Sequence, residues 1–374
     1  MTNIPNSVKA KIGLNLHNKL NHPLCIVKDL IVSHFKNKFK QSNIDISVFD
    51  DMNPIASTVD NFDLLRIPEN HPSRSQSDTY YIDETHVLRT HTSAHQNELL
   101  SKGLRSFLVI GDVYRKDQVD RFHYPVFHQM EGVHIVDASV DPEVDLKETL
   151  GSLAKYLFPG KEFRFNNDYF PFTEPSFEME VKFGDKWLEI LGCGVIHHDI
   201  LDKHGIQQKG WAFGFGLERI CMILFNIPDI RLFWKNSEKF LVQFNSNEVL
   251  SQLTKADGKI TEFKPYSSLD SVNRDISFWI NEKDITIDNV SNEFKWNKIN
   301  EFYEMVRELC GDNIENVNLY DKFFHKKTLK YSHTFRLTFS ADIDMNNPGL
   351  FKKAVDSYMT ELYTKLPQLE VILR

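Results

Sequence analysis

The fold of this chain is decided by SFLVIGDVYRKDQVDRFHYPVFHQMEGVHIV, residues 106–136. Both ends of the stretch are apolar and rich in β-branched and aromatic residues, a composition that favours β-strands. The polar segment KDQVDR (116–121) separates the two ends. We therefore predict two antiparallel strands joined by a charged loop, with Arg115 at the end of the first strand.

Helices and further strands are predicted on either side of this pair. Apolar residues recur at helical spacing after Pro23, and a second helix is expected over 92–104, with Thr92 as its N-cap. WLEILGCGVI (187–196) predicts another strand. FGFGLERICMILF (213–225) predicts a glycine-rich turn that leads into a buried helix.

The last hundred residues have a regular alternation of element types. After a polar stretch, the apolar patterns predict a strand, a helix, two strands, a helix and a closing strand, at 272–280, 296–310, 314–323, 331–340, 348–364 and 369–374. The order β-α-β-β-α-β is that of the ferredoxin-like fold. We therefore predict a larger sheet domain followed by a small α/β domain, which makes the fold class α+β.

Composition excludes several classes of protein. The chain has 374 residues and a formal net charge of −8, so it is not a generally basic nucleic-acid binder, and RNA contacts must come from local basic patches. Its four cysteines lie far apart without a CxxC pair, which argues against a disulfide framework or a cysteine zinc site. No apolar run is long enough to span a bilayer, so no membrane association is expected.

Arg115 and Arg219 are candidate phosphate-binding residues. Activation of a carboxylic acid by ATP requires cations at the places where negative charge gathers, and a guanidinium binds phosphate oxygens bidentately. Arg115 ends an apolar strand beside a polar loop, and Arg219 follows GFGLE at the start of a buried helix. For a single arginine, a solvated surface charge is the simpler interpretation.

Both arginines lie in recognisable motifs. YRKD at 114–117, with the returning HYPVF (123–127), resembles motif 2 of class II aminoacyl-tRNA synthetases, and GFGLER (214–219) resembles motif 3. The surrounding segments resemble the catalytic core of the phenylalanyl-tRNA synthetases of the single-chain mitochondrial type: THTSAH (90–95), GDVYRKDQVD (111–120), FHQMEG (127–132), YFPFTEPSFE (169–178), LGCG (191–194) and NIPDIRLFW (226–234).

This resemblance covers nearly the whole chain and implies a domain plan. Residues 1–12 would be a disordered start or presequence remnant, and 13–240 a class II catalytic domain built on an antiparallel sheet. A linker (241–268) and an anticodon-binding ferredoxin-like domain (269–374) would follow. The implied activity is that of a phenylalanine–tRNA ligase. Phenylalanine and ATP form phenylalanyl-adenylate and pyrophosphate, and the 3′-terminal ribose of tRNA(Phe) then takes the phenylalanine. No stretch resembles an editing domain.

The resemblance also implies which residues bind ATP. Arg115 would hold the α-phosphate and Asp117 would help to place adenine. Phe127 would stack on one face of adenine, and Arg219 would lie over the other face and reach the γ-phosphate, an arrangement that suits a ring and a guanidinium. The catalytic residues implied are therefore Arg115 and Arg219. The complete ATP-binding set comprises Arg115, Asp117, His123, Phe127, Glu189, Gly216 and Arg219.

The implied phenylalanine pocket has a polar and an apolar part. Ser93, Gln129 and Glu131 would hold the substrate ammonium group. His91 would lie near the substrate carboxylate, and Ala212 would line the pocket floor. Phe170 and Phe172 would meet the benzyl ring edge to face, and their i, i+2 spacing places both on one face of a strand. Ordinary core packing is the alternative interpretation of this FPF sequence.

Metal binding has two candidate forms. His86, His91 and His95 are closely spaced, but HTSAH lacks the glutamate that zinc proteases place after the first histidine, so zinc is disfavoured. Mg²⁺ accompanying ATP is the expected metal, because magnesium is commonly held by substrate phosphates and one or two carboxylates. Glu174 and Glu189 are its candidate ligands.

The expected partners are tRNA(Phe), L-phenylalanine and ATP. Residues 322–336 carry a local basic patch without an acid, and the candidate tRNA-binding residues are Lys322, Lys326, Lys327, Lys330 and Arg336. A solvated hairpin explains this charge pattern equally well. The resemblance to single-chain enzymes implies a monomer in the mitochondrial matrix, with the cytoplasm as the alternative location.

Two other functions share this sequence pattern. A synthetase-like paralogue could adenylate an amino acid for another acceptor, although the C-terminal domain argues against it. A non-catalytic RNA-binding protein could use the same scaffold, although the intact set of Arg115, Phe127 and Arg219 argues against that.

Overall fold

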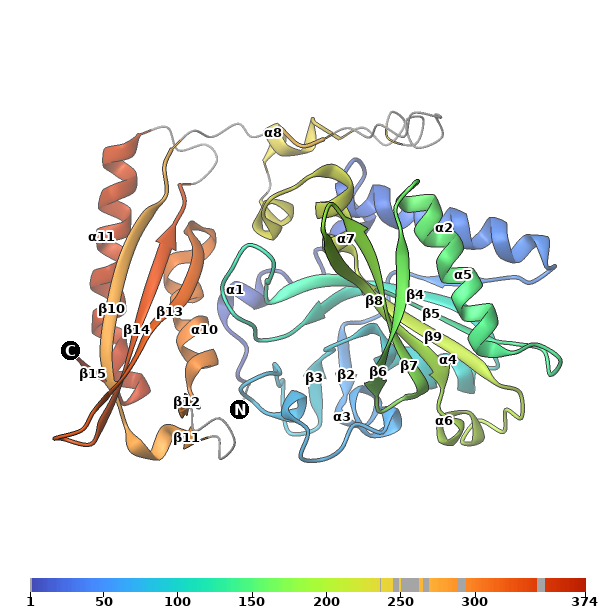
Figure 1. The fold of residues 1–374 in the computed structure, drawn as a ribbon, viewed down its shortest axis with the longest axis horizontal. Helices are drawn as coiled ribbons and strands as arrows, with labels where there is room; N and C mark the ends of the chain where they lie inside the picture. The colour runs from blue at the N-terminus through green and yellow to red at the C-terminus, as the bar shows by residue number, and fades with distance from the viewer. Residues whose placement is uncertain are drawn as a thin grey trace. The chain divides into compact units, whose positions relative to one another are not determined.

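The computed structural model describes residues 2–235, 237–244, 249, 262–264, 269–287, 294–341 and 347–374. The chain divides into two units (Figure 1). The first unit consists of Met1–Asn3, Lys11–Arg115 and Val126–Phe263, and the second of Ile4–Ala10, Lys116–Pro125 and Lys264–Arg374. Most of the predicted linker, 241–268, lies outside the described residues.

The first unit contains one large sheet with helices around it. Its helices are α2 (Pro23–Gln41), α3 (Thr58–Asn61), α4 (Gln96–Ser101), α5 (Pro142–Leu157), α6 (His198–Asp202), α7 (Leu217–Phe225) and α8 (Glu238–Leu241). Its strands are β1 (Ser47–Phe49), β2 (Ile55–Ser57), β3 (His86–Leu88), β4 (Ser106–Tyr114), β5 (Val126–Ile135), β6 (Phe163–Phe170), β7 (Thr173–Phe183), β8 (Lys186–Ile196) and β9 (Gly210–Gly216).

The two strands predicted from 106–136 are confirmed as the antiparallel pair β4–β5, in which Val113 faces Phe127. They lie in a seven-stranded sheet with the order β1-β4-β5-β9-β8-β7-β6. Within this sheet β1 runs parallel to β4, and the other neighbouring strands are antiparallel. The sheet is therefore mixed, whereas the sequence predicted an antiparallel one.

Strand β9 gives the sheet two unlike faces. Trp211, Phe213 and Phe215 are buried on one face, and Ala212, Gly214 and Gly216 alternate with them on the other. The sequence predicted a glycine-rich turn here, and that prediction was wrong. The strand continues to Gly216 because its aromatic residues, spaced two apart, all find a buried face.

Helices cover the aromatic face of this sheet. The Phe35 ring of α2 stacks on Phe213 with ring centroids 5.2 Å apart, and Phe39 meets Trp211 edge-on at 6.3 Å. Figure 1 shows α2 and α5 next to each other on one side of the sheet. The small residues of β9 are left for the opposite face. None of the helices in the described ranges combines the length and apolar character needed to cross a membrane.

The second predicted helix is present but begins differently. A 3-10 turn, η4 (Thr92–His95), precedes α4, and the residue at its N-cap is His91, without a side-chain cap. Thr92 is therefore not the N-cap. Its backbone N–H donates instead to the Gln129 side chain at 3.3 Å, which ties the turn to β5.

The second unit contains a four-stranded antiparallel sheet with the order β13-β14-β10-β15. Its elements are α1 (Asn6–Lys9), β10 (Val272–Ile280), β11 (Ile285–Ile287), β12 (Phe294–Trp296), α10 (Ile299–Cys310), β13 (Ile314–His325), β14 (Lys330–Phe339), α11 (Pro348–Lys365) and β15 (Ile372–Leu373). All six predicted elements of this region are present, but α10 begins at Ile299 and not at 296, and the closing strand is only Ile372–Leu373. The hairpin β11–β12 was not predicted.

One apolar core holds the second unit together. Helices α10 and α11 pack on the same face of the sheet, where Phe302, Val306 and Val355 meet Phe278 and Phe335. The strands alternate as amphipathic strands should, so Trp279 of β10 points to the other face while Phe278 is buried.

Candidate active site

Arg115 and Phe127 lie together at the adjoining ends of β4 and β5. The guanidinium carbon of Arg115 is 5.3 Å from the centroid of the Phe127 ring, within the range of a cation–π contact. The Arg115 Nε–H donates to the Thr90 carbonyl at 2.7 Å. The structure therefore brings together the predicted phosphate-binding arginine and the predicted adenine-stacking ring.

Arg219 and Gly216 lie where β9 gives way to α7. A side chain at position 216 would stand 3.9 Å from the Phe127 ring, so Gly216 lies beside that ring. The Arg219 Nη1–H donates to the Glu189 carbonyl at 3.2 Å and lies 3.7 Å from the Glu189 carboxylate. Both side chains are about half exposed, so Arg219 can reorient toward a ligand.

Asp117 and His123 belong by their contacts to the second unit, within the segment Lys116–Pro125. Arg307 donates to the carbonyls of Asp117 and Gln118, and the N–H of Val317 donates to the Val119 carbonyl at 2.9 Å. His123 Nδ1 lies 2.7 Å from an Asp120 carboxylate oxygen. The part of Asp117 and His123 in ATP binding stays a prediction.

The predicted ammonium-binding residues converge from η4 and β5. Glu131 is 3% exposed, and the hydroxyls of Thr92 and Ser93 donate to its carboxylate. Its Oε1 atom is buried without a hydrogen-bond partner. Burial raises the pKa of Glu131 to about 8, although the two hydroxyls act in the opposite direction. A buried, half-satisfied carboxylate of this kind would gain from a cationic ligand.

His91 lies beside this group as a neutral imidazole. Burial, followed by the charge of Arg115, lowers the pKa of His91 to about 3. Both of its ring nitrogens are buried without a partner. A neutral imidazole carries one N–H donor, so His91 can donate to a substrate carboxylate next to Arg115.

Phe170 and Phe172 form the aromatic part of the site. Their rings stack with centroids 5.8 Å apart and an interplanar angle of 9°. β6 ends at Phe170 and β7 begins at Thr173, so Phe172 lies in the turn between them. The prediction that both residues lie on one strand face was therefore wrong, because Pro171 begins a turn. Phe172 also packs against the apolar cluster that contains Ala212.

A hollow lies over Gly214 on the face of small residues. A side chain added at Gly214 would meet no atom within 4 Å. Its neighbours across the strands are Glu131 on β5 and Gly192 on β8, and the Phe170 ring fills the space above Gly192. The two neighbours lie two strand spacings, about 10 Å, apart. The hollow is thus open between the carboxyl group of Glu131 on one side and the aromatic ring of Phe170 on the other.

A buried ion pair positions the η4 side of this hollow. Arg89 and Asp112 are both about 1% exposed, and their guanidinium and carboxylate lie 2.9 Å apart. Arg89 also donates to the Met52 carbonyl at 3.1 Å and to His95 at 2.9 Å. Arg89 Nη2 would lie only 2.0 Å from a side-chain carbon at position 111, so Gly111 is required there. The pair holds the segment that carries His91 against β4.

The carboxylates suggested for magnesium are not all together. Glu174 lies opposite the end of β8, and Glu180 is the residue that faces Glu189. Six residues of β8 separate the two levels, about 20 Å, so Glu174 and Glu189 cannot share one ion. Glu178 was not predicted as a site residue. Burial and the charges of Glu189 and Asp168 raise its pKa, so these three carboxylates lie close together. The alternating pattern of FEMEV was the available signal.

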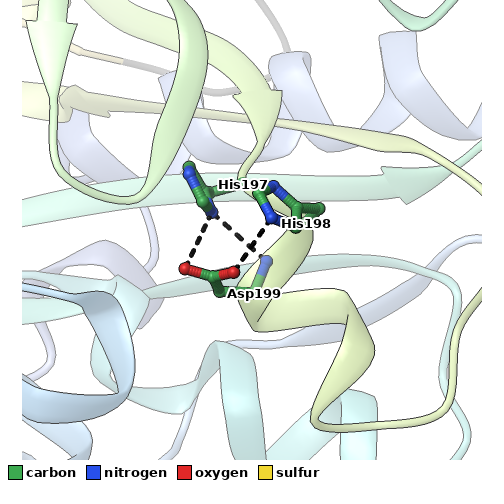
Figure 2. A group of neighbouring side chains, drawn as sticks. All are labelled: His197, His198 and Asp199. Atoms are coloured by element: carbon green, nitrogen blue, oxygen red, sulfur yellow. Dashed lines mark hydrogen bonds and ion pairs between the residues drawn. The ribbon is translucent and has the colours of Figure 1, made fainter.

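A different group has the composition of a metal site. His197, His198 and Asp199 have ligand atoms within 4.8 Å of one another (Figure 2). Their contacts have another explanation, because His197 Nδ1 accepts from the Asp199 N–H at 3.2 Å and starts α6. Arg66 also holds the Asp199 carboxylate at 3.1 Å. This group therefore caps a helix and forms an ion pair.

The candidate tRNA-binding residues of the second unit lie on the β13–β14 hairpin. Lys326 and Lys327 are exposed in its turn, and Lys330 begins β14. Lys322 lies 5.8 Å from the Phe294 ring. Arg336 donates from Nε and Nη2 to Asp275, both at 2.8 Å, so its charge is already paired. The hairpin therefore offers lysines at its turn, whereas Arg336 is occupied.

Known proteins resemble this chain over most of its length. Residues 16–244 match the family described as "tRNA synthetases class II core domain (F)". The chain is 42% identical to the mitochondrial phenylalanine–tRNA ligase of Mus musculus, over 90% of this chain and 79% of the mouse protein. Identity to the chloroplastic/mitochondrial enzyme of Arabidopsis thaliana is 43%, over 90% and 75% of the two chains. Identity to the mitochondrial enzyme of Saccharomyces cerevisiae is 34%, over 96% and 92%.

The pKa of Glu131 predicts pH-dependent amino-acid binding. With a pKa of about 8, the empty site holds a protonated Glu131 at pH 6.5, and an ammonium ligand requires the carboxylate. The Kd for phenylalanine should therefore fall as pH rises from 6.5 to 8, by up to about tenfold per pH unit. Calorimetry at several pH values measures it. Glu131→Gln should bind weakly at every pH, and equal wild-type Kd values at pH 6.5 and 8 would contradict the assignment.

The hollow over Gly214 predicts a variant that folds but binds poorly. Ala at position 214 meets no protein atom, so Gly214→Ala should keep the wild-type Tm within about 2 °C, while its methyl group occupies ligand space. Phenylalanine-dependent exchange of pyrophosphate into ATP should fall at least tenfold. Gly132→Ala is the matched contrast on β5: its methyl group would lie 2.3 Å from the Phe213 ring, so its Tm should drop. Normal exchange by Gly214→Ala would show that the hollow is not the binding site.

Proposed function

The chain belongs to the phenylalanine–tRNA ligase family of class II aminoacyl-tRNA synthetases, and we propose that the residues described above divide the family's reaction among them. Ligation of phenylalanine to tRNA at the expense of ATP is its activity. The observation that carries the proposed assignment of residues is the hollow over Gly214, which lies between buried Glu131 and the ring of Phe170.

Phenylalanine binds in the hollow with its ammonium group at Glu131. The unpartnered Oε1 of Glu131 accepts from the ammonium group, supported by Ser93 and Gln129. The benzyl ring extends toward Phe170 and Phe172, with Ala212 in the apolar cluster at its end. The carboxylate points toward His91 and Arg115. This placement supports selection for an aromatic amino acid, because a polar side chain would lose its hydration against two rings.

ATP binds next to the carboxylate of phenylalanine. Adenine stacks on the Phe127 ring, above Gly216, and Arg219 closes over its other face. Arg115 binds the α-phosphate, and its present contact with Phe127 keeps the guanidinium within reach. The carboxylate oxygen of phenylalanine attacks the α-phosphate, and pyrophosphate leaves. Arg115 stabilises the charge that builds on the α-phosphate oxygens without any proton transfer.

The carboxylates near Arg219 fit a magnesium ion. Glu189, Glu178 and Asp168 offer the oxygen ligands that Mg²⁺ prefers, and their mutual repulsion at Glu178 would be relieved by a cation. When bound with ATP, the ion neutralises phosphate charge. Glu178 and Glu189 are its proposed holders, in place of Glu174.

The second unit is proposed to bind the anticodon stem and loop of tRNA(Phe). Its element order and its strand order β13-β14-β10-β15 agree with a ferredoxin-like domain. Lys326 and Lys327 at the hairpin turn supply the contacts to phosphates. We assign the chain to the mitochondrial matrix as a monomer, in keeping with relatives that are named mitochondrial.

The sequence pattern alone also allowed an adenylating paralogue with another acceptor. It would share the phenylalanine and ATP sites and would differ only in the second step. Aminoacylation of tRNA(Phe) transcript by the purified chain distinguishes the two functions, because the rival would exchange pyrophosphate into ATP but leave the tRNA uncharged.

Loss of the Arg115 guanidinium should stop adenylate formation. Arg115→Ala removes the cation at the α-phosphate, so phenylalanine-dependent exchange should fall by at least about 10²-fold. Circular dichroism melts should stay close to wild type, because Arg115 lies at the end of β4 and its bond to the Thr90 carbonyl is a local contact. Arg105→Ala is the control, because Arg105 lies at the opposite end of β4 from Arg115. An Arg115→Ala enzyme with normal exchange would refute the role.

Reversal of charge at the hairpin should affect tRNA alone. In Lys326→Glu/Lys327→Glu, repulsion of phosphates should raise the KM for tRNA at least tenfold, most strongly at low salt. Pyrophosphate exchange, which needs no tRNA, should stay within twofold of wild type. A reversal at Lys352 and Lys353 of α11 is the control with equal charge change. If pyrophosphate exchange fell as much as tRNA binding, the assignment of tRNA binding to the hairpin would be wrong.

A further inference from the structure

Glu218 is a buried carboxylate for which the reaction above has no use. It directly precedes Arg219 in α7 and is 1% exposed. Its carboxylate accepts from the backbone N–H of His128, with its two oxygens at 3.0 and 2.8 Å, and from His128 Nδ1 at 2.7 Å. Glu218 therefore reaches across from the start of α7 to β5.

The partner side chain is held firmly in place. A carboxylate accepts hydrogen bonds, so His128 Nδ1 must carry the hydrogen. The His128 ring is fully buried and stacks on Trp234 with centroids 5.3 Å apart and an interplanar angle of 20°. His17 packs against it at 5.1 Å. Because the ring cannot turn away, the bond to Glu218 fixes one end of β5 relative to α7.

The bond between Glu218 and His128 lies just beyond the end of the ladder between β5 and β9. The ladder between β5 and β9 ends at the pair Gln129 and Gly216. Beyond that pair the two segments carry Phe127, the residue before His128, and Arg219, the residue after Glu218. The N-cap of α7 is Gly216, a residue without a side chain that could cap the helix. Glu218 thus joins two segments that the ladder no longer joins, one residue away from each proposed adenine contact.

We propose that Glu218 is a positioning residue for the nucleotide site: it sets the spacing between the Phe127 ring and the start of the Arg219 side chain. The inference rests on the proposed function, in which those two groups enclose adenine. Spacing matters because stacking contacts on a flat base weaken when either partner moves by a fraction of an ångström. Glu218 itself touches neither ATP nor phenylalanine.

A purely structural role makes a different prediction. If Glu218 only stabilised the fold, its loss would lower the Tm and impair both substrates or neither. A positioning role instead separates the two substrates. ATP binding should weaken, whereas phenylalanine binding, which uses Glu131 and the hollow over Gly214, should be unchanged.

The test compares Glu218→Ala with wild type and with Asp145→Ala. Asp145 accepts from buried Trp211 Nε1 at 2.6 Å, so its removal also breaks a bond to a carboxylate, but at α5. For Glu218→Ala we expect the KM for ATP in pyrophosphate exchange to rise at least tenfold, with the phenylalanine Kd within twofold of wild type. For Asp145→Ala we expect a lower Tm and both constants unchanged.

His128→Leu is the second variant. It removes the side-chain bond and keeps the backbone bond, so the KM for ATP should rise about threefold, and it carries the test if Glu218→Ala does not fold. A KM for ATP within twofold of wild type in the folded variant, or a parallel rise in the phenylalanine Kd, would overturn the inference. Absence of phenylalanine-dependent exchange in the wild type would overturn the proposed function instead.

Discussion

The ring of Phe213 occupies the space that a side chain at position 132 would need, with 2.3 Å between a ring carbon and the would-be β-carbon. This contact fixes the register of β5 against β9. A slip by one residue would turn every side chain of a strand to the opposite face. A slip of β5 would place Glu131 under the helices, and a slip of β9 would place Phe213 in the hollow. The site therefore exists because one face of β9 carries aromatic residues and the other carries glycine and alanine.

Two buried ionisable groups of the first unit, Glu131 and Arg89, have opposite surroundings. Glu131 is buried beside hydroxyls but not beside a cation, which leaves its carboxyl group ready for a substrate ammonium group. Arg89, by contrast, is fully matched by Asp112 and by the Met52 carbonyl. The first arrangement suits binding because one oxygen is left unpaired. The second suits structure, because burial of an unpaired arginine would be very costly.

Adenylate formation requires little covalent chemistry from the protein. The proposed catalytic groups are therefore arginines and an aromatic ring, which act by position and charge. Their value depends on where they are held. Arg115 is tied to the Thr90 carbonyl, and His128 next to Phe127 is tied to Glu218. Because these hydrogen bonds are already formed, the groups they hold need little reorganisation when charge develops on the phosphate.

Most elements of this protein, and the motifs of its family, can be predicted from the amino-acid sequence alone. Apolar, β-rich composition predicted β4 and β5, and alternation with a period of two predicted β14. The motifs around Arg115 and Arg219 indicated a class II synthetase. Two predictions from local pattern were wrong. The glycines of β9 were predicted to form a turn, and Phe172, which was predicted to lie in a strand, lies in a turn. The three-dimensional arrangement was needed to show that Glu178, not Glu174, lies near Glu189, and that Glu218 reaches His128. Such neighbours come from strand register and from packing between distant segments, which no local spacing encodes.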